Sequence, residues 1–176
     1  MGETTDTGGL GRSTDAARRG APYAGRMARS PRRDSIPPAD GARIAAALHE
    51  TRSCVVVVVN RSPRELVLSG AKPLHGVFQP GPPVRVAPGA RGAFGAQSAP
   101  GQGGAGCAAI VTYEAGSGIV LSLRFDVPYA GRNAAAATVW GPEPAALAVA
   151  SSAGPGHVRA AIRFVIDTPA ENEVLP

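Results

Sequence analysis

The sequence predicts an all-β protein, a β-sandwich with one or two short flanking α-helices and a disordered N-terminal arm. A β-branched run at 54–59 and two alternating segments at 119–127 and 158–166 have the pattern of strands around a shared core. Clusters drawn from 23 glycines and 17 prolines separate these apolar segments along the 176 residues. Because at most two short segments favour helix, an alternating βαβ sheet is not expected.

The chain divides by composition into three parts. Residues 1–38 mix Gly, Ser, Thr, Arg and Pro with few aliphatic side chains, so they cannot bury enough apolar surface to offset the entropy of ordering. We therefore expect a disordered basic arm at 1–38, a folded domain at 39–169 and a flexible tail at 170–176. The formal charge of +5 favours anionic partners without choosing among phospholipid, nucleic acid and acidic protein.

Two short helices are expected beside the strands. Residues 39–49 contain good helix formers behind Asp40, a suitable N-cap, and Pro142-Glu143-Pro144 could open a second helix that continues to Ala150. Ile44 and Leu48 lie one turn apart in the first helix. Such a narrow apolar stripe more often docks a helix onto its own core than onto a membrane.

The strands follow from the apolar patterns. The run 54–59 has the length of a strand buried on both faces, and it stops at the turn sequence Asn60-Arg61-Ser62-Pro63. Short strands are expected at 66–68 and 84–86, a Gly-rich loop at 95–106, and a hairpin of 107–113 with 119–127. The side chains expected to face the core are Ile119, Leu121, Leu123, Phe125 and Val127, then Val158, Ala160, Ile162, Phe164 and Ile166.

The inventory of reactive residues does not favour an enzyme. The histidines are His49, His75 and His157, and neither a Gly-x-Ser-x-Gly elbow nor a phosphate-binding Gly-rich loop is present. Cys54 and Cys107 are too few for a zinc site, so no cofactor or metal is expected, and the two thiols are read as buried. Whether they pair depends on whether their strands are neighbours.

Nothing in the sequence predicts a membrane span or an exported precursor. No stretch approaches the roughly 20 apolar residues of a transmembrane helix, and the N-terminus lacks the pattern of a secretory signal. We expect a soluble monomer that associates with membranes, with secreted and cytosolic locations both open. Nucleic-acid binding is unlikely on this sequence because the basic arm lacks interleaved aromatic residues.

Two segments carry a family resemblance. Residues 106–113 read Gly-Cys-Ala-Ala-Ile-Val-Thr-Tyr, and residues 121–129 read Leu-Ser-Leu-Arg-Phe-Asp-Val-Pro-Tyr. Together they resemble the hairpin of the actinoporin family of pore-forming cytolysins, in which a Gly-Ala-Val-Gly-Val-Leu-x-Tyr strand leads into Phe-Ser-Val-Pro-Tyr. The resemblance spans roughly 39–167 and is strongest at 106–129.

The resemblance implies a membrane lipid-binding, pore-forming function. Family members bind phosphocholine or sphingomyelin headgroups through an aromatic-rich loop, self-associate on the membrane, and insert an N-terminal helix to form a cation-permeable pore. Carried onto this sequence, the implied headgroup-binding residues are Ala108, Asp126, Pro128, Tyr129 and Trp140. The implied membrane-inserting helix is the one that carries Ile44 and Leu48.

Some positions depart from the family pattern. Asp126 replaces the serine of the motif, and Asn133 with the alanines at 134–137 stands where the family has aromatic residues. These departures leave an alternative from another class, a non-lytic interaction module on the same sandwich that has lost the phosphocholine site.

Overall fold

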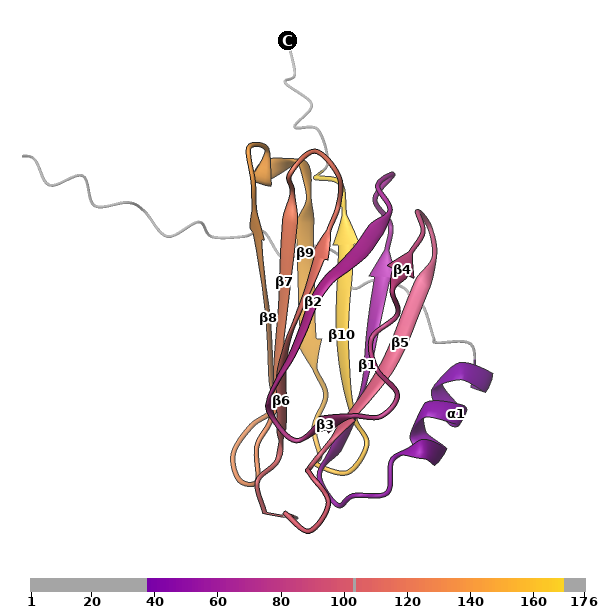
Figure 1. Ribbon diagram of the computed structural model, residues 1–176, viewed down its shortest axis with the longest axis vertical. Helices are drawn as coiled ribbons and strands as arrows, with labels where there is room; N and C mark the ends of the chain where they lie inside the picture. The colour runs from indigo at the N-terminus through magenta and orange to yellow at the C-terminus, as the bar shows by residue number, and fades with distance from the viewer. Residues whose placement is uncertain (1–37, 103, 170–176) are drawn as a thin grey trace, which may run out of the picture. The chain divides into compact units, whose positions relative to one another are not determined.

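The computed structural model describes residues 38–102 and 104–169, which form two five-stranded sheets packed face to face (Figure 1). In order across the first sheet lie β3 (Val77–Phe78), β5 (Arg91–Gln97), β1 (Ser53–Asn60), β10 (Ala160–Asp167) and β9 (Ala148–Ala153). The second sheet contains β4 (Arg85–Val86), β2 (Leu66–His75), β6 (Cys107–Glu114), β7 (Val120–Val127) and β8 (Ala134–Trp140). One helix, α1 (Pro38–Ala47), flanks the first sheet, and the predicted fold class is confirmed.

The predicted arm and tail fall outside the described residues, apart from Pro38. This proline is the first residue of α1, where its fixed φ and missing N–H suit the first helical turn. The boundaries of the arm and the tail stay predictions.

Strand β1 lies at the centre of the first sheet. It pairs in parallel with β10 and antiparallel with β5, and all eight of its residues are buried. Cys54, Val56 and Val58 point into the sandwich core, whereas Val57 and Val59 form a second cluster with Val165. The prediction of a strand buried on both faces is confirmed.

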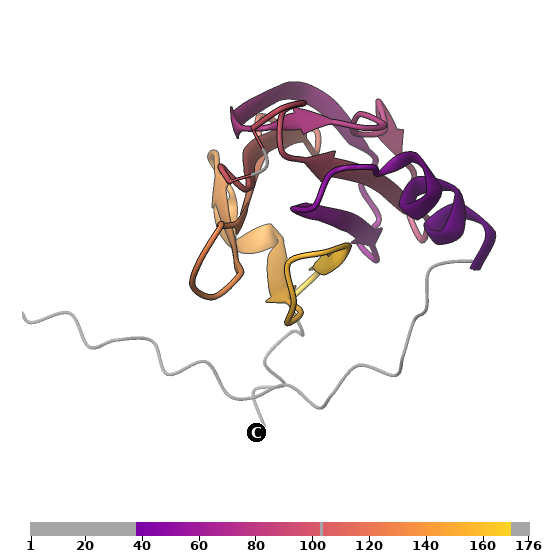
Figure 2. The same cartoon turned by 90° about the horizontal axis from the view of Figure 1, so that it is seen from below.

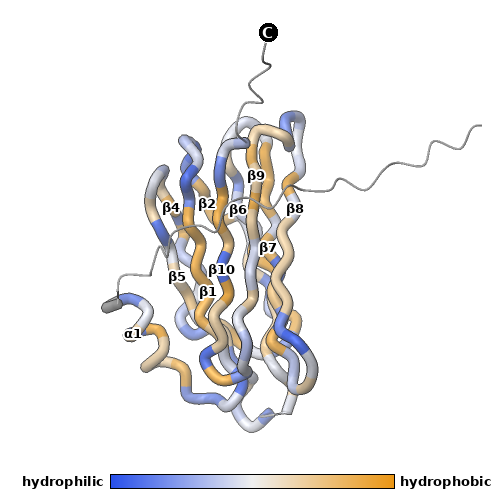
Figure 3. The backbone as a smooth tube through the Cα atoms, turned by 180° about the vertical axis from the view of Figure 1, so that it is seen from behind, coloured by the Kyte–Doolittle hydropathy of each residue, from blue (hydrophilic) through white to orange (hydrophobic). Residues whose placement is uncertain are grey.

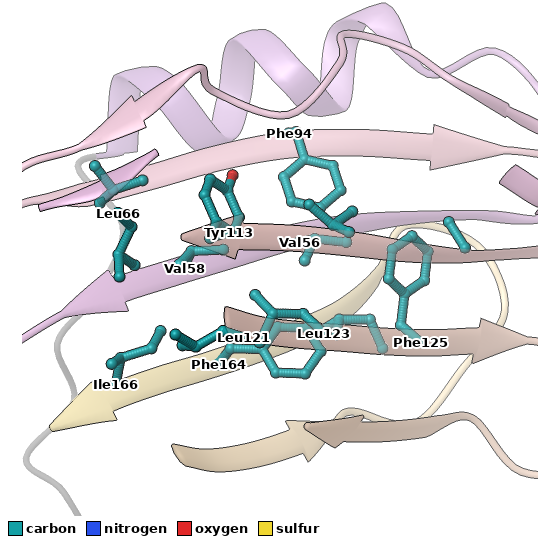
Figure 4. Packing of buried hydrophobic residues seen from close by; sticks show 14 of the residues in the cluster. Val56, Val58, Leu66, Phe94, Tyr113, Leu121, Leu123, Phe125, Phe164 and Ile166 are labelled. Atoms are coloured by element: carbon teal, nitrogen blue, oxygen red, sulfur yellow. The ribbon is translucent and has the colours of Figure 1, made fainter. Parts of the chain in front are cut away.

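The core lies between the sheets and is anchored by aromatic side chains from both (Figure 4). The rings of Phe94 and Phe125 lie 6.1 Å apart, from β5 in one sheet and β7 in the other. The five predicted inward residues of 119–127 are at most 1% exposed. In the last strand the alternation holds from Ala160 to Ile166, but Val158 precedes β10 and is 59% exposed.

The predicted loop at 95–106 is wrong at its start, because β5 continues to Gln97. Gly95, counted in the predicted loop, and Gly92 lie within β5 and make room for a crossing segment. A Cβ at Gly95 would collide with the carbonyl oxygen of Gln79, and one at Gly92 would lie 2.6 Å from Pro83. Glycine in a strand interior often marks such a close approach.

The predicted second helix at 142–150 is also wrong. A three-residue 3-10 turn, η1 (Pro144–Ala146), leads instead into β9. The alanines favour helix locally, but β9 pairs along β10 and turns Val149 and Ala153 toward the core. Neighbouring β8 is a second alanine-rich strand that the sequence pattern did not predict.

Cys54 and Cys107 are buried free thiols, as expected, but they come from different sheets. Their sulfur atoms lie 3.9 Å apart across the core, one on β1 and one on β6. The hydrogen bond to Cys107, together with burial, raises the pKa of the Cys54 thiol well above its ordinary value.

Candidate functional site

The candidate site is one end of the sandwich, where four connections meet. We call it the loop end; it comprises the segments 48–52, 98–106 without Gly103, 128–133 and 154–159. Figure 2 looks onto this end. The segments are joined by backbone hydrogen bonds, Ser53 N to His157 O at 3.0 Å and Ser98 N to Arg52 O at 2.9 Å.

An exposed tyrosine is held by an arginine at the loop end. Tyr129 begins the turn after Pro128 and is 58% exposed. The guanidinium carbon of Arg52 lies 5.0 Å from the centre of its ring, within the range of a cation–π contact. The Nε atom of Arg52 is buried and has no hydrogen-bond partner. Segments 77 residues apart in the chain therefore meet at this pair.

A hollow of about 370 Å³ also lies at this end, between the β7–β8 and β9–β10 loops. Asn133 holds its two walls together, because its Nδ2 donates to Gly154 O at 2.8 Å and to Gly156 O at 2.5 Å. With both amide hydrogens engaged, Oδ1 of Asn133 stays buried without a partner, as does Nδ1 of His157. The residues around the hollow are Gly131, Arg132, Asn133, Ala153, Gly154, Pro155, Gly156 and His157.

The loop end carries several arginines. Among the described residues, Arg52, Arg132 and Arg159 form no ion pair with a carboxylate. At the opposite end, two arginines form ion pairs. Nη2 of Arg64 lies 3.8 Å from Oε2 of Glu143, and Nη1 of Arg85 lies 2.6 Å from Oε2 of Glu65. In Figure 3 the β7–β8 loop below β8 is markedly hydrophilic, while the strands above it are hydrophobic.

Four of the five predicted headgroup residues lie at or beside the loop end. Ala108 and Asp126 are opposite each other on β6 and β7, on the outer face of the second sheet. Ala108 is only 3% exposed, Asp126 and Pro128 are half-buried, and Tyr129 is exposed.

Trp140 does not belong to this group. It pairs with Val120 at the far end of β8, whereas Ala134 at the near end pairs with Asp126. Six residues of strand separate the two ends, about 20 Å at roughly 3.4 Å per residue. Trp140 is 53% exposed, so the described part of the chain presents one strongly exposed aromatic ring at each end.

The predicted inserting residues, Ile44 and Leu48, are packed against the domain. They are 7% and 3% exposed and form a small cluster with Val55 of β1, with Ala45 and Ala93 at its edge. This agrees with the expectation that the stripe docks onto the chain's own core. A cavity of about 370 Å³ separates part of α1 from β5. No described helix has both the length and the apolar character needed to span a bilayer.

Sequence reasoning missed the residues that shape the hollow. In the sequence, His157 was considered only as one of three histidines in an inventory that did not favour an enzyme, and Asn133 only as a position where an aromatic residue is missing. The one local signal was the glycine and proline content of 154–156, which indicates a turn but not what it faces.

The sequence matches no protein-family model and no curated protein, so the comparisons rest on structure. The lipid binding protein Nakanori has a TM-score of 0.65 at 13% identity, over 73% of this chain and 77% of Nakanori. The RahU protein, solved in complex with a TRIS molecule, has a TM-score of 0.53 at 15% identity, over 70% of this chain and 100% of RahU. IP-1A from Alcaligenes faecalis has a TM-score of 0.51 at 14% identity, over 72% of this chain and 97% of IP-1A.

The fold is shared with a lipid-binding protein. At these identities the likeness is one of fold, and at that level it agrees with the resemblance to actinoporins. Membership of the actinoporin family stays a prediction.

Proposed function

We propose that this protein binds lipid membranes through its loop end. The observation that carries the proposal is Tyr129, an exposed amphipathic ring at the tip of a rigid sandwich and in contact with Arg52, which forms no ion pair with a described carboxylate. Such rings settle at the boundary between headgroups and acyl chains. The shared fold with the lipid binding protein Nakanori supports the same function class.

Other exposed apolar side chains lie on the same end. Val158, in the β9–β10 loop, is 59% exposed, and Leu74, one residue before the end of β2, is 36% exposed. Together with Tyr129 they give this end three exposed apolar side chains. Apolar tips beside arginines suit an interface whose outer layer carries phosphate and whose inner layer is hydrocarbon.

The test is sedimentation of the full chain with vesicles that contain phosphatidylcholine, sphingomyelin and phosphatidylserine. Replacing Tyr129 by alanine removes the interfacial ring, and we expect binding weaker by about 1 kcal/mol, roughly fivefold. Circular dichroism of the variant checks that the fold is kept. The proposal fails if the wild-type chain sediments with no vesicle, or if Tyr129→Ala binds as tightly as the wild type.

Pore formation through α1 is a second candidate function. The observation that favours it is the small contact between α1 and the domain: Ile44 of α1 packs on Val55 beside an open cavity, and Leu48, the other buried side chain of this cluster, follows the end of the helix. A ten-residue helix reaches about 15 Å, half of a hydrocarbon core of about 30 Å, so a pore needs more of the chain than α1.

Dye release from the same vesicles tests this step. If undocking of α1 limits the release, Ile44→Ala will speed it, because the variant weakens the docked state. Ala46→Ser, at an exposed position of the same helix, serves as the control. Binding without release, in the wild type and in Ile44→Ala, supports a non-lytic membrane-binding module.

A further inference from the structure

We propose that the loop end selects anionic lipid headgroups rather than choline, because an arginine of the chain itself occupies the position that a quaternary ammonium would take. The inference rests on the proposed function and adds the chemical class of the headgroup.

The ring face of Tyr129 already contacts a cation. A choline group is held by aromatic rings when its cation lies within about 6 Å of a ring centre. The guanidinium carbon of Arg52 is already 5.0 Å from the centre of Tyr129. A second cation would have to displace Arg52 or share the face against charge repulsion.

No second ring is available to replace that face. Within the described residues, Trp140 is the one other aromatic side chain with high exposure, and it lies at the opposite end of β8. Tyr113, Phe94 and Phe125 are buried in the core. The described residues therefore offer no cage of several rings around choline at this end.

The guanidinium groups of Arg52 and Arg132 are the charges that could bind a phosphate. The Nε of Arg52 and the side chain of Arg132 have no carboxylate partner among the described residues, and Arg132 lines the hollow. A planar guanidinium matches the oxygens of a phosphate in two parallel hydrogen bonds. Asn133, which clamps the loops on either side of the hollow, fixes the backbone next to Arg132.

The position of Asp126 decides on which side the phosphate lies. This carboxylate is on the outer face of the second sheet, beside Ala108, where the resemblance to actinoporins would place the phosphate contact. Because like charges repel, the phosphate is expected in the hollow by Arg132 instead. A hollow of about 370 Å³ is within the size range of small-ligand sites, roughly 300–1,000 Å³.

The experiment measures binding of the full chain to phosphatidylcholine vesicles with and without phosphatidic acid. We expect the wild type to bind the anionic vesicles roughly thirtyfold more tightly, on the order of the contribution of two arginines at a charged surface. Arg132→Ala is expected to lose most of that preference. Arg52→Met is expected to lose it and also to gain affinity for phosphatidylcholine, since the ring face of Tyr129 is then open.

The matched control is Arg85→Ala, which removes the same charge at the opposite end, where the arginine is paired with Glu65. Equal losses in Arg85→Ala and Arg132→Ala would mean that net charge alone, including that of the basic arm, drives the binding, and would overturn the inference. Equal binding of the wild type to both vesicles would overturn it as well, while the proposed function would stand. No binding to either vesicle would remove the proposed function itself.

Inorganic phosphate, compared with chloride at equal ionic strength, separates two sources of the same chemistry. Release of the wild type from anionic vesicles by phosphate, absent in Arg132→Ala, supports a site that takes phosphate whether free or on a lipid. Retention on the vesicles supports a site that requires the lipid surface as well.

Discussion

The two ends of the sandwich are built from similar parts and differ in how their polar groups are satisfied. At the end opposite the loop end, which we call the turn end, Arg64 and Arg85 are paired with glutamates and the side chain of Asn60 is fully hydrogen-bonded. At the loop end, Arg52 and Arg132 have no carboxylate partner among the residues that the structure describes, and Oδ1 of Asn133 is buried without a hydrogen-bond partner there. Arginine and asparagine side chains therefore have polar partners at the turn end, whereas at the loop end some of their polar atoms have none among the described residues.

This difference indicates a division of labour between the ends. Polar groups that satisfy one another contribute to stability and have little left for a ligand. Unpaired groups cost stability and are ready to bind. We therefore expect substitutions at the turn end to change the free energy of unfolding, and substitutions at the loop end to change membrane binding.

The largest stability effect is expected for Asn60→Ala. Asn60 is 0% exposed; its Nδ2 donates to the carbonyl of Arg64 at 2.7 Å and to that of Val86 at 3.0 Å, while its Oδ1 accepts from the hydroxyl of Ser62 at 2.7 Å. Its loss leaves several buried groups unpaired, and we expect a destabilisation of about 3 kcal/mol in urea unfolding. Vesicle binding of the folded protein should be unchanged, and a parallel loss of binding would break the division between the ends.

A buried phenol gives the turn end a dependence on pH. Burial raises the pKa of Tyr113 above its ordinary value, and its hydroxyl donates to Pro83 O at 3.1 Å. Above about pH 10 the unfolded chain loses this proton while the folded chain keeps it, so stability falls as the pH rises. Tyr113→Phe is expected to lower the free energy of unfolding by about 1.5 kcal/mol at neutral pH. Between about pH 9 and 11, the free energy of unfolding of this variant should fall less steeply than that of the wild type. Urea unfolding at each pH measures this difference, and an equally steep fall of the unfolding free energy in the wild type and in Tyr113→Phe would contradict this account.

Asn133→Ala is the loop-end counterpart of Asn60→Ala. Asn133 is half-buried and spans two carbonyls of the β9–β10 loop, so we expect a destabilisation of only about 1 kcal/mol. Binding to anionic vesicles is expected to fall severalfold because the walls of the hollow separate. Urea unfolding and sedimentation of the same preparation measure both effects. A larger loss of stability than in Asn60→Ala would reverse the comparison.

The sequence was most informative where the alternation of side chains was regular. The sequence predicted the inward residues of 119–127 because burial on one face gives an alternation of apolar and polar residues. It predicted the central strand 54–59 because burial on both faces gives a continuous apolar run. Strands β5, β8 and β9 were missed because their glycines and alanines have weak strand propensity, and pairing with neighbouring strands decides their conformation.

The candidate site was only partly predictable for a related reason. Pro128 and Tyr129 belong to a contiguous motif, so a resemblance could find them. The contact of Arg52 with Tyr129 joins residues far apart in sequence, and neither residue alone indicates the other. Trp140 was grouped with them by resemblance, and the register of β8 against β7 separates it from them.

The smallest effect is expected for Trp140→Ala, and it tests the comparison most directly. Trp140 and Tyr129 are similarly exposed, at 53% and 58%, so a membrane that simply favoured exposed rings would lose as much from either substitution. If the loop end alone meets the lipid, Trp140→Ala will bind vesicles within about twofold of the wild type while Tyr129→Ala weakens. Because tryptophan is the stronger interfacial anchor of the two types, an unchanged affinity would mean that orientation, and not aromatic exposure, determines which end contacts the bilayer.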